Sequence, residues 1–157
     1  ISHYLEIDID LKLVGDVDSN FKKKFDSVRK KSFNNLRLTH IDKLPFQELD
    51  AIYQQCDCIL FGSKSENSPH TLLEGIQRGI PIICRDRQFN HYYLRDEGIY
   101  YDDFDTLLDC IRSISTSASN RRLIGKRTLS LIKNHQIANI LPARCDFITS
   151  SEILDDR

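Results

Sequence analysis

The chain of 157 residues is 40% apolar and 29% charged, the composition of a soluble globular domain, so we expect residues 1–157 to form one unit. Its 22 basic and 23 acidic side chains give a net charge of -1, which excludes a global field that would recruit nucleic acid. No apolar run is long enough to span a bilayer, and residues 1–20 hold no apolar signal-peptide core, so we expect a cytoplasmic or cytosol-facing protein.

The period of the apolar residues alternates between that of a strand and that of a helix. In chain order we expect strands at 11–14, 36–39, 58–61, 80–84 and 99–101. An amphipathic helix, capped by Ser19 or Asn20, is expected after the first strand, with an apolar face of Phe21, Phe25, Val28 and Phe33. The other expected helices are one opened by Pro45, one from Pro69 to Arg78 ended by Gly79, and two at 104–114 and 123–134. We expect Tyr92 and Tyr93 in the core or at a sheet edge.

This alternation predicts βα units around a parallel sheet, a three-layer Rossmann-like α/β fold. Ligands of such sheets bind beyond the carboxyl ends of the strands, where the loops 15–20, 40–44 and 62–69 are expected. Neither the G-x-G-x-x-G pattern of dinucleotide-binding proteins nor the Walker A pattern occurs, so both of those classes lose their main support.

The five cysteines are an odd number without C-x-x-C spacing, which argues against a disulfide framework. Cys56 and Cys58 are two residues apart, and residues at that spacing on a strand share a face without closing around an ion; no second Cys pair or His-x-x-His completes a tetrahedral zinc site. We therefore expect reduced, mostly buried thiols and no metal.

The stretch from 62 to 79 is the most informative part of the chain. Glu66 lies in the loop after a buried strand, and Glu74 lies one to two turns into the next helix, which Ser68 is expected to cap. Unpaired N–H groups at a helix start attract an anion, so a phosphate fits there. Glu74 would accept hydrogen bonds from a ribose, and Glu66 would meet hydroxyls beyond the phosphates. His70 either donates to a phosphate or caps the helix start. The pattern predicts a sugar nucleotide.

The motifs around these glutamates resemble a known family. The series Ser63-x-x-Glu66, Pro69, Leu72-Leu73-Glu74-Gly75 and Gly79-Ile80-Pro81-Ile82 is similar to the E-x7-E signature of group-1 (family 4) glycosyltransferases with the GT-B fold. The resemblance runs from about Leu11 to Ile114. It implies the C-terminal, nucleotide-sugar-binding lobe of an enzyme that usually retains anomeric configuration and needs no metal.

The resemblance also implies roles for individual residues. Glu66 would be catalytic, contacting the donor sugar or supporting charge at the reacting centre, and Glu74 would bind the donor ribose. The other expected donor-binding residues are Thr71 and Leu72 through their backbone N–H groups, His40, Ile41 and Asp42 at the base pocket, Gly15 near the phosphates, and Ser68, His70 and Lys64. Without the resemblance, His40 reads as a surface residue.

Two departures from the family pattern stand out. The first is that Gly75-Ile76 replaces the usual Ala-Met. The second is that the chain begins in what looks like the helix after the first strand of the lobe. In the family, that strand is followed by a Gly-Arg turn and a nearby Lys that neutralise the diphosphate. The resemblance implies that the acceptor-binding lobe is missing from residues 1–157 as well. Lys64, Arg85 and Arg87 would substitute for those cations in part, and we expect weak donor binding and no turnover by this chain.

The leading hypothesis is transfer of a hexosyl unit from a UDP- or GDP-type donor to a glycan or lipid-linked acceptor. Two alternatives stay open: a non-catalytic GT-B-like module that binds a partner subunit, and a GT-B-shaped sugar-nucleotide epimerase. The basic stretch at 22–24 and 29–31 reads as a solvated helix face, with peripheral contact to an anionic membrane as the alternative.

Overall fold

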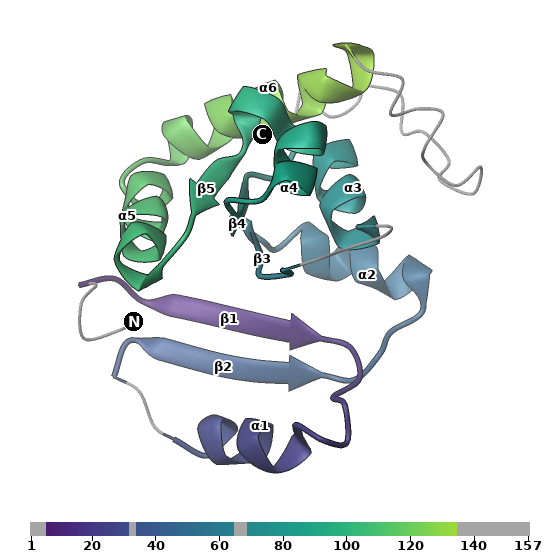
Figure 1. Ribbon diagram of the computed structural model, residues 1–157, viewed down its shortest axis with the longest axis vertical. Coiled ribbons are helices and arrows are strands. Elements are labelled where there is room, and N and C mark those ends of the chain that lie inside the picture. Colours follow the sequence, from purple (N-terminus) through teal and green to yellow (C-terminus); the bar gives the residue numbers. More distant parts are fainter. Residues whose placement is uncertain (1–5, 32–33, 65–68, 135–157) are drawn as a thin grey trace.

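A computed structural model describes residues 6–31, 34–64 and 69–134 (Figure 1). Its strands and helices alternate as the apolar periods predict, which confirms the α/β class. In chain order they are β1 (Ile9–Val14), α1 (Lys22–Arg29), β2 (Leu36–Ile41), α2 (Phe46–Tyr53), β3 (Ile59–Phe61), α3 (His70–Gln77), β4 (Ile82–Arg85), α4 (Gln88–Leu94), the 3-10 turn η1 (Arg95–Glu97), β5 (Ile99–Tyr101), α5 (Phe104–Ser115) and α6 (Ala118–Asn134).

The strands pair in parallel, as expected, but their hydrogen bonds form two separate sheets in the described part of the chain. One sheet has the order β1-β2, with Ile9 opposite Leu36. The other has the order β3-β4-β5, with Ile59 opposite Ile82. Figure 1 shows β1 between β2 and the three-stranded sheet.

The three-stranded sheet holds the core, because helices cover both of its faces. On one face Ile59 and Ile82 pack against Leu72 and Ile76 of α3. On the other face the core comprises Ile83, Tyr101, Cys110 and Ile114, the last two from α5. The sheet is therefore the middle of three layers, and the predicted Rossmann-like layering is confirmed there.

Two boundaries near the amino terminus differ from prediction. The strand predicted at 11–14 begins earlier, at Ile9. Helix α1 has Phe21 at its N-cap with no side-chain cap bond, so the expected cap by Ser19 or Asn20 is wrong. The reason is local: the Asn20 N–H donates to Oδ1 of Asp18 at 2.8 Å, which closes a turn one residue before the helix.

Tyr92 and Tyr93 lie on helix α4, and the expected placement in the core or at a sheet edge is wrong for Tyr92, whereas the partly buried Tyr93 packs against the core as expected. Tyr92 is 68% exposed, while Leu94 at the end of the same helix is fully buried. The strand predicted at 80–84 starts two residues later, at Ile82, because Ile80 and Pro81 connect it to α3.

Gly79 ends α3 as predicted, with a φ of 61° that favours glycine. Helix α6 crosses the chain at this point. A Cβ built on Gly125 of α6 would lie 2.2 Å from the Gly79 carbonyl oxygen, so the two backbones are in direct contact. No helix in the described ranges is long and apolar enough to cross a membrane.

Candidate functional site

Parallel strands present their carboxyl ends to ligands, and the predicted site residues gather at those ends in two groups. The first follows β1 and β2 and comprises Gly15, His40, Ile41 and Asp42; the second follows β3 and comprises Lys64, His70, Thr71, Leu72 and Glu74. In Figure 1 the carboxyl ends of β1 and β2 and the start of α3 lie on the same side of the molecule. The predicted catalytic Glu66 and the predicted cap Ser68 lie outside the described residues.

The start of α3 provides backbone donors. Pro69 occupies the N-cap, and the N–H of Leu73 donates to the Pro69 carbonyl at 3.0 Å. The N–H groups of His70, Thr71 and Leu72 therefore precede this first helical hydrogen bond, where helix geometry directs donors out of the helix start. The side chains of His70 and Thr71 are exposed, whereas that of Leu72 is fully buried. Leu72 can therefore serve a ligand only through its backbone.

Glu74 follows one turn into α3, and its carboxylate is held from a neighbouring helix. The hydroxyl of Tyr53, the last residue of α2, donates to Oε2 of Glu74 at 2.7 Å. Burial, followed by the hydrogen bond to Glu74, raises the pKa of Tyr53 above its ordinary value. Tyr53 therefore stays a neutral donor at physiological pH, and it fixes one oxygen of the half-buried Glu74 carboxylate.

Arg78 completes this network. Its Nε donates to Oδ1 of Asp50 on α2 at 3.0 Å, its Nη2 contacts the same oxygen, and its Nη1 donates to the Glu74 carbonyl at 3.1 Å. The guanidinium also lies over the Tyr53 ring, 4.6 Å from its centroid. Helices α2 and α3 are thereby tied together behind the carboxylate. The sequence patterns did not predict this role for Tyr53, Arg78 and Asp50.

The loops after β1 and β2 are tied together by a histidine. Nε2 of His40 lies 2.8 Å from the carbonyl oxygen of Gly15, whose φ of 127° is in the range that favours glycine. The rings of His40 and Phe25 of α1 also pack edge to face, with their centroids 5.0 Å apart. The His40 side chain is 12% exposed, so its alternative interpretation as a surface residue is wrong. Ile41 is half-buried beside it, and Asp42 is 98% exposed.

The three cations expected near the phosphates differ in their surroundings. Lys64 is exposed in the loop after β3. Nε of Arg85, at the end of β4, donates to the carbonyl oxygen of Gly62 at 3.2 Å. Arg87 forms an ion pair with Asp102 at 3.1 Å. All three cations thus lie at or just after the carboxyl ends of the strands, but the charge of Arg87 is paired with Asp102, which comes directly after β5.

The cysteines in the described part of the chain form no disulfide. Cys56, Cys58, Cys84 and Cys110 are free thiols, and the last two are buried as expected, while Cys56 and Cys58 are half-buried. Burial raises the pKa of Cys58 to about 11 and that of Cys84 to about 12. In the part of the chain that the structure describes, no three His, Cys, Asp or Glu side chains gather as a metal ion would need.

Parallel strands that alternate with helices, with a helix start and a fixed carboxylate at the carboxyl edge of the strands, define a Rossmann-like α/β fold. The model of the family described as glycosyl transferases group 1 matches residues 2–128, a range that includes both groups of predicted site residues. The chain therefore belongs to this glycosyltransferase family, which confirms the resemblance of its motifs. A comparison with curated proteins found no match.

Proposed function

We propose that this chain is the donor-binding lobe of a retaining glycosyltransferase of family 4. The enzyme would move a hexosyl unit from a UDP- or GDP-type sugar to a glycan or lipid-linked acceptor. The observation that carries the proposal is the carboxylate of Glu74, which Tyr53 holds one turn after the helix start. A carboxylate has about four lone-pair positions, so the bond from Tyr53 leaves acceptor capacity for two ribose hydroxyls.

The phosphates of the donor would sit at the start of α3, against the N–H groups of His70, Thr71 and Leu72. A helix N-terminus favours an anion by roughly 0.3 to 2 kcal/mol, whereas micromolar binding needs about 8 kcal/mol. Lys64 and Arg85 would add positive charge, since both lie at this edge of the sheet. The balance favours weak binding of the donor by this chain, and the resemblance to the family implies that no metal is needed.

The remaining residues take their roles from the family. Glu66 would contact the donor sugar and stabilise positive charge at the reacting carbon, Gly15 would lie near the phosphates, and His40, Ile41 and Asp42 would line the base pocket. We also propose a cytosolic location, supported by the free thiols, with peripheral contact to the membrane where the acceptor is a lipid.

Calorimetric titration with UDP-sugars and GDP-sugars tests the proposal. We expect one nucleotide class to bind and Glu74→Ala to weaken it at least tenfold. Glu48→Ala is the matched control, because Glu48 is an exposed glutamate on α2 outside both groups of site residues. The proposal fails if neither class binds at millimolar concentration, or if Glu74→Ala binds as tightly as the wild type.

A further inference from the structure

Arg85, the last residue of β4, carries an unbalanced charge at the edge of the candidate site. Both residues that follow it have partners. Oδ1 of Asp86 lies 2.7 Å from Nε2 of His91, and Arg87 pairs with Asp102. Arg85 itself is half-buried and forms no ion pair with any residue of the described ranges. Because a guanidinium keeps its charge at every physiological pH, this charge is available to an anionic ligand.

The guanidinium of Arg85 is held from two sides. Its Nε donates to the Gly62 carbonyl oxygen at 3.2 Å, and the group lies over the ring of Tyr101, 5.4 Å from the centroid. The bond to Gly62 uses one of the five N–H groups of an arginine, so four remain on Nη1 and Nη2. Within the described ranges these four have no hydrogen-bond partner. A carboxylate can accept two parallel hydrogen bonds from such a pair of nitrogens.

The backbone at Arg85 is fixed as well. Its carbonyl oxygen accepts from Nδ2 of Asn90 at 2.7 Å. The N–H of Asp86, which belongs to the same peptide group, donates to the Tyr101 carbonyl at 2.8 Å. Asn90 is fully buried, and its Oδ1 has no partner in the described part of the chain. Since a buried oxygen without a donor destabilises the fold, Asn90 contributes mainly through its bond to Arg85.

Arg85 also lies where the transferred sugar of the donor would be. Helix α2, which holds Glu74 through Tyr53, joins β2 to β3, whereas α3 joins β3 to β4. A donor with its ribose at Glu74 and its phosphates at the start of α3 therefore runs along the strand ends toward β4. Figure 1 shows β3 between β1 and β4. Neighbouring strands are about 4.8 Å apart, so the group after the phosphates reaches the end of β4.

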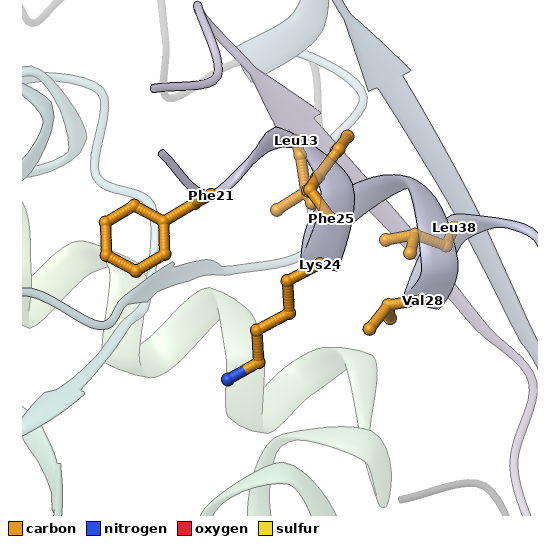
Figure 2. Close-up of a pocket in the computed structure, with 6 residues that line it drawn as sticks. All are labelled: Leu13, Phe21, Lys24, Phe25, Val28 and Leu38. Carbon is orange, nitrogen blue, oxygen red and sulfur yellow. The ribbon is translucent and has the colours of Figure 1, made fainter. Parts of the chain in front are cut away.

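The other end of the site is apolar and does not suit an acid group. His40 packs on Phe25, which lines an apolar hollow beside α1. The other lining residues, shown in Figure 2, are Leu13, Phe21, Val28, Leu38 and Lys24. Asp42, at the same end of the site, is 98% exposed and would repel a carboxylate. The base of the donor therefore fits this end, and an anionic group fits the end at Arg85.

We propose that Arg85 binds a carboxylate on the transferred sugar, so that the donor is a nucleotide-diphosphate hexuronate. This assignment rests on the proposed function and narrows its donor from hexoses in general to hexoses that carry an acid group. The carboxylate at C6 would accept hydrogen bonds from Nη1 and Nη2, while Lys64 and the start of α3 serve the diphosphate. A neutral hexose has a hydroxyl group at C6, which leaves the charge of Arg85 unbalanced.

Calorimetry with matched donors tests the proposal. The pairs are UDP-glucuronate with UDP-glucose, UDP-galacturonate with UDP-galactose, and GDP-mannuronate with GDP-mannose, and the members of each pair differ only at C6. We expect the wild type to bind the uronate of one pair at least tenfold more tightly than its neutral partner. Arg85→Gln should remove this preference, because it weakens the uronate at least tenfold more than the neutral donor. Binding of the neutral donor that remains shows that the variant is folded.

Lys64→Gln is the matched control, because it removes another positive charge from the same edge of the sheet. It should weaken both donors of a pair alike and leave the preference for the uronate in place. A preference that Lys64→Gln removes as completely as Arg85→Gln would show general attraction of charge and would overturn the proposal.

Two other results would overturn it. One is a wild type that binds the uronate no more tightly than the neutral donor in every pair. The other is an Arg85→Gln variant that weakens both donors equally, which would assign Arg85 to the diphosphate. If neither nucleotide class binds at all, the proposed function itself fails. Nucleotide binding that depends on Glu74 but shows no preference for a uronate refutes the hexuronate alone.

Discussion

Replacing Gly125 by alanine places a methyl group where α6 crosses the end of α3. The added Cβ would lie 2.2 Å from the Gly79 carbonyl oxygen, while ordinary contacts begin at 3.4 Å. The nearest atom belongs to backbone, so no side chain can rotate to make room. Helix α6 must instead move away from α3 by more than 1 Å.

The expected cost follows from two opposing terms. Overpacking of a core costs about 1–3 kcal/mol, and a forced backbone shift belongs at the upper end of that range. Alanine returns about 1 kcal/mol through its higher helix propensity. The net loss in the free energy of unfolding is therefore about 2 kcal/mol, and for a chain of this size the melting temperature should fall by about 4–8 °C.

Urea denaturation followed by circular dichroism measures this loss. Lys126→Ala, at an exposed position of the same helix, is the matched control and should stay within about 0.5 kcal/mol of the wild type. Gly75→Ala should cost less than Gly125→Ala, because its new Cβ meets Cδ1 of Ile59, the end of a flexible side chain. If Gly125→Ala unfolds at the same urea concentration as the wild type with an unchanged slope, the crossing is not tight and the reasoning is refuted.

Three further predictions concern single side chains. Tyr53→Phe removes the donor to Glu74 and should weaken sugar-nucleotide binding severalfold in calorimetry; unchanged affinity would separate this contact from the site. Asp103 caps α5, and its hydrogen bonds to Thr106 lower its pKa in the folded protein. The cap therefore stabilises the fold fully above the pKa that Asp103 has in the unfolded chain, and this stabilisation is lost as the pH falls through the lower pKa of the folded protein. The melting-temperature difference between wild type and Asp103→Ala should therefore shrink in acid, and a constant difference would contradict the cap. Cys84, fully buried with a pKa of about 12, should resist iodoacetamide at pH 8 until the protein unfolds, as peptide mass mapping would show.

The parts of the fold that the sequence predicts correctly depend on local signals. Pro69 marks the start of α3, Gly79 marks its end with a positive φ, and the apolar run before Gly62 forms a buried strand. These features involve residues within a few positions of one another, so propensity and apolar period are sufficient to find them.

The parts that were missed depend on contacts between distant residues. Tyr53 and Glu74 are 21 positions apart, and Asp50 and Arg78 are 28 apart, so no local pattern links them. Arg78 follows Glu74 by one helical turn, a spacing that indicates a contact between the two residues. The Arg78 guanidinium, however, donates to the backbone carbonyl of Glu74 and not to its carboxylate. The division of the sheet was equally hidden, because strand pairing is not encoded in the apolar period of any one strand.

The bond between Tyr53 and Glu74 also has a spectroscopic consequence. The chain contains six tyrosines and no tryptophan, so its intrinsic ultraviolet emission comes from phenol rings. A phenol that donates to a carboxylate emits weakly, because the excited ring passes its proton to that acceptor. Ligand hydroxyls that bind the remaining lone pairs of Glu74 would make its carboxylate a weaker acceptor for the Tyr53 proton and so brighten this emission. Subtracting the signal of Tyr53→Phe isolates the change. The fluorescence of Tyr53 would thus report binding of the proposed ligand at Glu74 without an added dye.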